Sequence, residues 1–218
     1  MKSKIRTYEN DDIEVTYDLG RCIHAAECVK GLREVFDPDK RPWIQPDRGE
    51  ADEVADTVEH CPTGALHYRM KHADREEQVP ETNAVVISRD GPVYLRGHIR
   101  FEDARGEVIL EDTRVALCRC GQSANKPVCD NTHAKVDFEA PSAFSTDSLD
   151  SDGGGSAGGS LVVRMMDNGP ALVEGAYQLY SDTMLPRNCS DKIALCRCGG
   201  SENKPFCDGT HKKIGFEG

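Results

Sequence analysis

The chain of 218 residues carries ten cysteines, and nine of them fall into three groups of three. Two groups lie in nearly identical segments, 116–133 and 194–211, which share 14 of 18 positions. Each segment has the spacing C-x-C-x8-C-x3-H. Three thiolates and one imidazole form a set of four soft ligands, which predicts one metal ion or one small iron–sulfur cluster. The candidate ligands are Cys118, Cys120, Cys129 and His133 in the first segment, and Cys196, Cys198, Cys207 and His211 in the second.

The spacing of the ligands bears on which metal they bind. Zinc accepts a tetrahedral Cys3His set, but structural zinc sites usually pair ligands two to four residues apart. Here a single residue separates the first two cysteines, which favours two thiolates on one iron and the remaining Cys and His on a second. Disulfide bonds are the other alternative. The first residues are charged and lack an apolar run, which predicts a chain that stays in the reducing cytoplasm, where cysteine clusters more often bind metals.

The two cysteine segments are parts of a longer internal repeat. The Gly-Pro pairs at 91–92 and 169–170 are 78 residues apart, and so are Phe138 and Phe216. Two gap-free copies, roughly 84–138 and 162–216, predict a duplicated domain. Each copy opens with β-branched residues around an Asp-Gly or Asn-Gly turn, which predicts strands over 84–87, 93–95, 161–163 and 171–173.

Composition sets the domain boundaries. Residues 141–160 are rich in Gly and Ser and predict a flexible linker. A charged stretch near 71–82 ends a separate N-terminal segment. The predicted parts are a small domain over 1–75, a first repeat unit over 80–140, the linker over 141–160 and a second unit over 161–218. The net charge of −11 gives no indication of a basic surface for nucleic acid. The sequence contains no run of about 18 apolar residues, so no membrane span is predicted.

The N-terminal segment is expected to alternate strands and helices. Apolar alternation predicts a strand over 13–17, and the following residues predict a helix over 24–32. An edge strand at 43–44, a helix over 51–60 and a closing strand over 66–69 complete a β-α-β-α-β order.

Cys22, Cys28 and Cys61 form the third group of cysteines. Bacterial ferredoxins use C-x2-C-x2-C and a distant Cys-Pro. The three positions match the first, third and last of those cysteines, whereas Ala25 stands at the second. Three thiolates suit a [3Fe–4S] cluster, or a [4Fe–4S] cluster whose fourth iron takes another ligand. His24 is a candidate for that ligand, and the alternative is a histidine with a surface or packing role.

The repeated motif C-x-C-x2-S-x3-P-x-C-D-[NG]-T-H closely resembles that of the CDGSH-type iron–sulfur proteins, the NEET family. The resemblance covers both segments and most of 84–216. It implies one [2Fe–2S] cluster in each copy, with the C-x-C pair on one iron and the third Cys and the His on the other. The first copy departs from the motif with Asn131 where the second has Gly209. Asn tolerates the left-handed backbone almost as well as Gly, so the loop is expected to form.

Residues 8–70 resemble divergent single-cluster ferredoxin domains, which are found joined to CDGSH domains in bacteria. The expected fold is therefore α+β, with a small ferredoxin-like domain before two tandem β-rich CDGSH units in a pseudo-two-fold arrangement. Other CDGSH proteins reach that arrangement by dimerising, so this chain is expected to be a monomer with an internal pseudo-dimer.

The expected function is electron transfer through two [2Fe–2S] clusters and one [3Fe–4S] or [4Fe–4S] cluster, to a redox partner protein. The alternative is a cluster store or sensor that donates clusters to an apo-protein. A zinc-stabilised interaction module is more remote. No Ser/His/Asp set, P-loop or dinucleotide motif is present, so no catalytic residues are predicted, and a redox activity toward an unidentified acceptor is the only enzymatic alternative.

Overall fold

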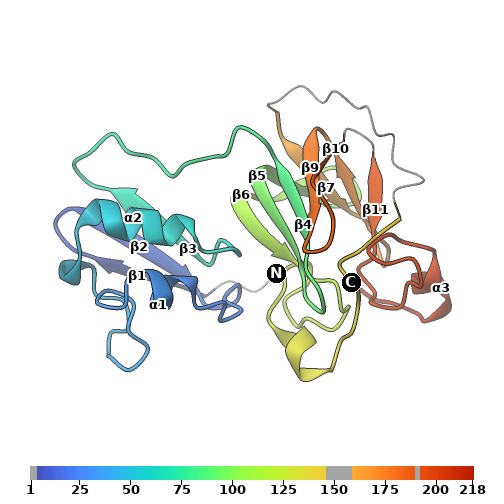
Figure 1. The fold of residues 1–218 in the computed structure, drawn as a ribbon, viewed down its shortest axis with the longest axis horizontal. Coiled ribbons are helices and arrows are strands. Elements are labelled where there is room, and N and C mark those ends of the chain that lie inside the picture. Colours follow the sequence, from blue (N-terminus) through green and yellow to red (C-terminus); the bar gives the residue numbers. More distant parts are fainter. Residues whose placement is uncertain (1–3, 146–158, 190–191) are drawn as a thin grey trace. The chain divides into compact units, whose positions relative to one another are not determined.

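The computed structural model describes residues 4–145, 159–189 and 192–218, and the chain divides into two compact units between Gln78 and Val79 (Figure 1). Most of the predicted linker, 146–158, lies outside the described residues. In the described parts of the chain, no helix has the length and apolar character that crossing a bilayer requires.

The N-terminal unit is built on a three-stranded antiparallel sheet with the order β1-β2-β3. Its strands are β1 (Ile5–Glu9), β2 (Ile13–Asp18) and β3 (Leu66–Met70). Val15 of β2 pairs with Tyr8 on one side and Tyr68 on the other. In β2, Ile13, Val15 and Tyr17 are buried and alternate with half-buried polar residues, because successive side chains of a strand point to opposite faces.

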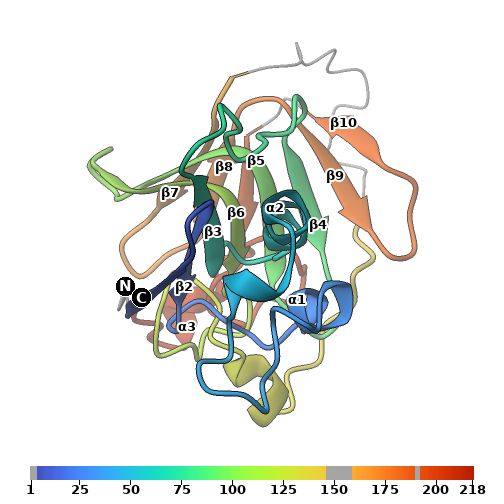
Figure 2. The ribbon, with the colours of Figure 1, turned by 90° about the vertical axis from the view of Figure 1, so that its left-hand side faces the viewer.

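Two short helices and one 3-10 turn complete this unit: α1 (Glu27–Gly31), η1 (Pro46–Arg48) and α2 (Ala51–Glu59). Both helices lie on one side of the strands (Figure 2), and α2 packs against β3 and α1. Val54, Ala55 and Val58 of α2 are fully buried, so the helix covers the apolar face of the sheet. The core of this unit comprises Ile13, Val15, Tyr17, Val35, Phe36, Ile44, Val54, Ala55, Val58, Cys61, Ala65, Leu66 and Tyr68.

The expectations for this unit were correct for the strand over 13–17, the helix over 51–60 and the strand over 66–69. The helix expected over 24–32 is shorter, because His24 and Ala26 have φ angles of 58° and 64°, which a right-handed helix does not accept. The strand expected at 43–44 is only an isolated bridge between Ile44 and Phe36. Strand β1 was not anticipated, since its side chains are mostly exposed and show no apolar alternation.

The C-terminal unit contains one eight-stranded sheet with the order β10-β9-β4-β5-β7-β8-β11, and β6 pairs with β5 beside this path. The first copy supplies β4 (Ala84–Ile87), β5 (Val93–Glu102) and β6 (Val108–Leu117). The second supplies β7 (Leu161–Met165), β8 (Ala171–Glu174), β9 (Tyr177–Ser181), β10 (Arg187–Cys189) and β11 (Ile193–Leu195). The strands predicted at the start of each copy are present.

The two copies are joined by reciprocal parallel pairing. Strand β4 of the first copy pairs with β9 of the second, with Ala84 opposite Gln178. Strand β7 of the second copy pairs with β5 of the first, with Val162 opposite Arg100. Val162 follows Ala84 by 78 residues and Arg100 precedes Gln178 by 78 residues, so each copy offers an equivalent strand to the other in the same register.

One hydrophobic core serves both copies. Buried residues of β4, β5 and β6 pack in the same cluster as buried residues of β7, β8, β9 and β11, including Val85, Leu95, Leu161, Val173 and Leu195. Since burial of these side chains is the main favourable contribution to folding, the two copies stabilise each other. The described part of the chain is therefore α+β, and its regular secondary structure is mostly β-sheet with a few short helices.

Candidate iron–sulfur sites

The first cysteine loop is closed by a short β-type contact. Strand β6 ends at Leu117, which forms an antiparallel bridge with Val128. The backbone N–H of Cys118 donates to the carbonyl of Pro127 (2.9 Å), and the N–H of Cys129 donates to the carbonyl of Ala116 (2.7 Å). The end of the strand therefore holds the first and third cysteines of the motif side by side.

The second copy repeats this construction. Leu195, at the end of β11, bridges Phe206, and the N–H of Cys196 donates to the carbonyl of Pro205 (2.8 Å). The N–H of Cys207 donates to the carbonyl of Ala194 (2.8 Å). The two loops thus share one backbone framework, as their sequence identity predicts.

A tight turn carries the chain from the third cysteine to the histidine. Asn131 and Gly209 have φ angles of 70° and 86° at equivalent positions, so the asparagine adopts the left-handed conformation expected for it. Asp208 accepts hydrogen bonds from the N–H groups of Glu202 (2.9 Å) and Thr210 (2.9 Å). Asp130 binds the equivalent N–H groups of the first copy. The histidines then lie in η2 (Thr132–Lys135) and α3 (Thr210–Lys213).

The candidate ligands lie in pairs at the separation that one tetrahedral metal requires. The sulfur atoms of Cys118 and Cys120 are 3.8 Å apart, and those of Cys196 and Cys198 are 3.6 Å apart. Two thiolates bound at about 2.3 Å to one tetrahedral ion lie about 3.8 Å apart. The distance from Sγ to Nδ1 is 3.3 Å for Cys129 and His133, and 3.4 Å in the equivalent pair. Each copy therefore presents two pairs of ligand atoms, and the two atoms of a pair are close enough to bind the same metal atom.

Burial and hydrogen bonds between the cysteines set the ionisation of these thiols. Burial raises the pKa of Cys129 to about 12. The hydrogen bond from Cys120 lowers the pKa of Cys118, and the same hydrogen bond raises that of Cys120. A metal ligand must be the thiolate, and a bound cation supplies the charge that displaces the proton. Main-chain N–H groups of Asn131, Gly209 and Gly200 also donate to cysteine sulfurs at 3.4 Å, which further stabilises thiolates.

The two cysteine loops touch each other through glycine. Gly121 and Gly199 have φ angles of 77° and 75° at equivalent positions. A Cβ atom on Gly121 would lie 2.5 Å from the carbonyl oxygen of Cys198, and one on Gly199 would meet the carbonyl oxygen of Cys120. The backbone beside one ligand set therefore lies against the backbone of the other, which requires glycine at both positions.

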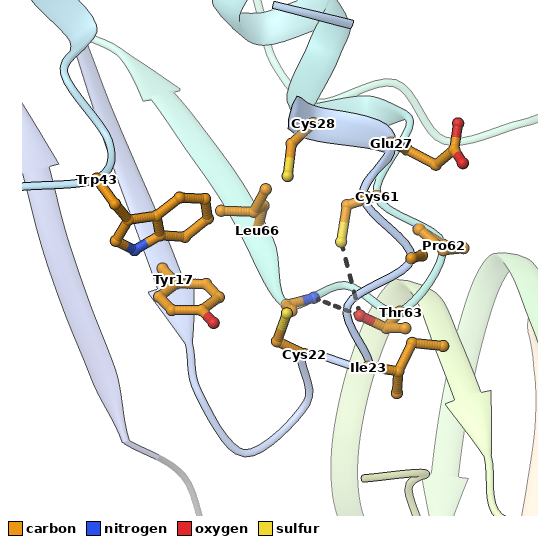
Figure 3. Close-up of a pocket in the computed structure, with 13 residues that line it drawn as sticks. Tyr17, Cys22, Ile23, Glu27, Cys28, Trp43, Cys61, Pro62, Thr63 and Leu66 are labelled. Atoms are coloured by element: carbon orange, nitrogen blue, oxygen red, sulfur yellow. Dashed lines mark hydrogen bonds between the residues drawn. The ribbon is translucent and has the colours of Figure 1, made fainter. Parts of the chain in front are cut away.

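In the N-terminal unit, Cys22, Cys28 and Cys61 line one pocket (Figure 3). Cys22 follows β2, Cys28 belongs to α1 and Cys61 follows α2, and their sulfur atoms point toward one another. The pKa of Cys28 is raised to about 11, first by burial and then by the charges of Cys61 and Cys22. When they ionise, the three thiolates repel one another in this apolar pocket. A shared cation would remove that repulsion, so the three cysteines are a suitable donor set.

Neighbouring groups hold these cysteines in place. The hydroxyl of Thr63 lies 3.6 Å from the sulfur of Cys61 and accepts the N–H of Ala65 (3.2 Å). The pKa of Tyr17 is raised, first by burial and then by its hydrogen bond with Cys22. Tyr17 packs edge-on against Trp43, with ring centroids 4.9 Å apart. Tyr17 and Trp43 therefore form an apolar wall of the pocket, and the hydroxyls of Tyr17 and Thr63 each lie beside a candidate ligand.

The structure also places the candidates for a fourth ligand. Ala25 lines the same pocket as the three cysteines, at the position where the bacterial motif has a cysteine. His24 is exposed and lines an open groove beside that pocket, together with Cys22 and Cys28. The carboxylate of Glu27 points away from the sulfur atoms (Figure 3).

Within residues 4–145, 159–189 and 192–218, no group of three or more His, Cys, Asp or Glu side chains gathers in the geometry of a single-ion site. The tenth cysteine, Cys189, lies on β10 and is buried in the core of the C-terminal unit.

Comparisons with known proteins agree with this geometry. The family described as "Divergent 4Fe-4S mono-cluster" matches residues 8–71, and the family described as "Iron-binding zinc finger CDGSH type" matches residues 90–134 and 168–212. The uncharacterized protein YjdI of Escherichia coli, in strains K12 and O157:H7, is 36% identical over 66 residues, which are 30% of this chain and 87% of the relative. No solved structure matches the chain.

The matched regions contain all of the candidate ligands, including the three cysteines of the first pocket and the two four-ligand motifs. The donor sets, the distances within the ligand pairs and the matched families all indicate that the bound group is an iron–sulfur cluster. The chain is an iron–sulfur cluster-binding protein and belongs to the CDGSH-type iron-binding proteins, in a form with a divergent 4Fe-4S mono-cluster domain before two CDGSH units.

Proposed function

We propose that this protein is an electron carrier with two [2Fe–2S] clusters, each held by three Cys and one His, and one N-terminal [3Fe–4S] or [4Fe–4S] cluster. The observation that carries the proposal is the reciprocal contact of Gly121 with Cys198 and of Gly199 with Cys120. Electron exchange between two centres needs close approach, and here the two ligand sets are in backbone contact. Bound clusters of this type accept and release single electrons.

The protein's own residues hold the clusters and shield them from water. In the first copy, Cys118, Cys120 and Cys129 are all buried. Lys126 is held over this loop by hydrogen bonds to the carbonyls of Ser123 (3.2 Å) and Gly121 (3.4 Å). Main-chain N–H groups donate to the sulfurs, which favours the more negative, reduced state.

The reciprocal strand pairing supports a pseudo-two-fold arrangement of the two CDGSH units. On this proposal the chain acts as a monomer with an internal pseudo-dimer, in the cytoplasm, and exchanges electrons with a redox partner protein. It has no substrate and no catalytic residues of its own. The ferredoxin-like character of residues 1–75 rests on the arrangement of Cys22, Cys28 and Cys61 around one pocket.

A second function, cluster donation to an apo-protein, is favoured by one difference between the copies. Cys198 and Cys207 are only half-buried, whereas the equivalent Cys120 and Cys129 are buried. The second site is therefore the more accessible, and it would be the donor. Rapid transfer of iron and sulfide to an apo-ferredoxin would support donation, whereas reversible reduction with intact clusters supports the carrier.

The replacement His211→Cys tests the assignment of the second cluster. A thiolate adds negative charge where the neutral imidazole had none, so we expect the reduction potential of this cluster to fall by on the order of 100 mV. A spectroscopic redox titration with intact iron and sulfide content measures this. The control is His98→Ala, which removes an exposed histidine of the same unit and leaves both potentials unchanged. An unchanged potential in His211→Cys contradicts the ligand assignment.

A further inference from the structure

An open groove of about 1030 Å³ lies beside the pocket of the N-terminal cysteines, within the N-terminal unit. Tyr8, Tyr17 and Trp43 give it aromatic surface, and Leu19 and Pro42 add aliphatic surface. Leu19 is 40% exposed and Pro42 is exposed, so this apolar surface is open to solvent. Aromatic side chains of this kind are enriched at the centres of protein interfaces.

The groove reaches two of the three candidate ligands of the N-terminal cluster. Cys22 and Cys28 line both the groove and the cysteine pocket, whereas Cys61 lines the pocket alone. Cys22 and Cys28 are also half-buried, whereas Cys61 is buried. The ligand set is therefore most accessible from the groove. Because electron exchange needs close approach of two centres, a partner seated in the groove comes close to this ligand set.

The permanently charged side chains that line the groove are all basic. They are Arg6 and Arg41, joined by the imidazole of His24, and the lining includes no aspartate or glutamate. The guanidinium of Arg41 donates to the carbonyls of Pro38 (2.8 Å) and Lys40 (2.5 Å). Both acceptors are uncharged, so these bonds hold the guanidinium without neutralising it. The whole chain carries 38 acidic and 27 basic residues, so this groove is a local exception to its charge.

Strand pairing places Arg6 beside the aromatic surface. In the pairing of β1 with β2, Arg6 stands opposite Tyr17 and Tyr8 stands opposite Val15. Residues opposite each other in an antiparallel pair lie on the same face of the sheet, and Tyr17 and Val15 belong to the core of this unit. Arg6 therefore lies on the face of the sheet that carries the cysteines, and not on the outer face.

We propose that this groove is the docking surface for a redox protein that presents an acidic patch around its own redox centre. The inference rests on the proposed function, because it needs a cluster at Cys22, Cys28 and Cys61. In the complex one electron passes from the reduced centre to the oxidised one, and no bond forms or breaks. The basic groove attracts the acidic patch although the chain has a net charge of −11. Redox complexes often bury less than about 1,200 Å² in total, so one groove suffices.

A protein partner fits the groove better than a small molecule or a second copy of the chain. Small-molecule sites usually have volumes of about 300–1,000 Å³ and enclose most of the ligand, whereas this groove is at the upper limit and open. A symmetric dimer through the groove would place the same patch of each copy together. Arg6 and Arg41 of one copy would then face those of the other, and such like-charge contacts are unfavourable.

The first measurement is of docking itself. Trp43 is the single tryptophan of the sequence and lines the groove, so full-length protein labelled with 5-fluorotryptophan gives one fluorine NMR signal from this surface. The probe is an unlabelled acidic flavodoxin, added without oxygen. We expect the signal to shift or broaden on addition of flavodoxin. The dissociation constant is expected to rise about tenfold between about 50 and 500 mM salt, because salt screens the attraction.

The second measurement removes the charge of the groove with Arg6→Gln combined with Arg41→Gln. We expect about tenfold weaker docking, and about tenfold slower reduction of the N-terminal cluster by reduced flavodoxin, followed by EPR. The matched control is Arg33→Gln combined with Arg69→Gln. It changes the net charge equally, but at arginines outside the groove that are already paired with carboxylates. Both quantities should stay within about twofold of the wild type in the control.

A third pair of substitutions separates charge from loop structure. Arg6→Lys combined with Arg41→Lys keeps both charges and is expected to keep docking. An equal loss in the Lys and Gln variants, or an equal loss in the groove and control variants, overturns the proposal. Docking that tightens with salt overturns it, and so does a Trp43 signal that is unchanged at about 1 mM flavodoxin.

The other occupants give results of their own. If free flavin mononucleotide shifts the Trp43 signal and flavodoxin does not, the groove is a small-ligand site. If the signal changes with the concentration of the labelled protein alone, the groove binds a second copy. Either result overturns the proposal. Failure of the proposed function looks different, because the wild-type protein would then contain no iron and sulfide or would not be reduced reversibly by dithionite.

Discussion

Replacing Gly121 with alanine is expected to destabilise the C-terminal unit by about 2–5 kcal/mol and to release iron from both of its sites. The added Cβ atom would lie 2.5 Å from the carbonyl oxygen of Cys198, and neither backbone can move without displacing a ligand. The φ angle of 77° adds a second cost for any residue with a side chain. A loss of this size is a large fraction of the stability of an ordinary domain.

Thermal unfolding and iron content measure this effect. The matched control is Gly215→Ala, where φ is 63° but no atom lies within 4 Å of the added Cβ. This variant has the unfavourable φ angle but no steric clash of the added Cβ atom, so it is expected to keep its iron. Wild-type stability and iron content in Gly121→Ala would contradict the contact between the two loops.

The second large effect is expected for Cys61→Ser, which should abolish the N-terminal cluster and leave the other two. Cys61 lines the pocket with Cys22 and Cys28 and is 8% exposed. A serine hydroxyl is a poor ligand for a soft metal centre. Iron analysis should therefore find about three or four fewer iron atoms per chain, with about four retained.

Cys189→Ser distinguishes a ligand from a buried thiol. Cys189 is 2% exposed and packs in the core of the C-terminal unit. Its replacement buries a hydroxyl group in an apolar core, so the free energy of unfolding should fall by about 1–3 kcal/mol, while the iron content stays at the wild-type value. Equal iron content in Cys61→Ser and Cys189→Ser would remove Cys61 from the ligand set.

Local spacing made the ligand pairs predictable from the sequence. Cys118 and Cys120 are two residues apart, and Cys129 and His133 are four apart, so the backbone of one loop or one helical turn brings each pair together. The same locality explains why Asn131 could be assigned a left-handed conformation. The helix at 51–60 was predictable because its apolar residues, Val54 and Val58, recur at helical spacing.

Contacts between the copies could not be predicted in this way. Gly121 and Gly199 require glycine only because the opposite loop lies against them, and Gly121 and Cys198 are 77 residues apart in the chain. Strand β6 was also missed, because its first half is exposed and carries Glu111 and Asp112 among its apolar residues. Its strand conformation is instead stabilised by backbone pairing with β5 along most of its length.

The central claim, that this chain holds three iron–sulfur clusters, is tested most directly by metal and sulfide analysis of protein purified without oxygen. Iron, zinc and acid-labile sulfide are measured per chain alongside the visible spectrum. We expect a coloured protein with about four iron atoms in the CDGSH units, about three or four more in the N-terminal unit, and a matching amount of sulfide. A colourless protein with stoichiometric zinc and no sulfide would contradict the claim.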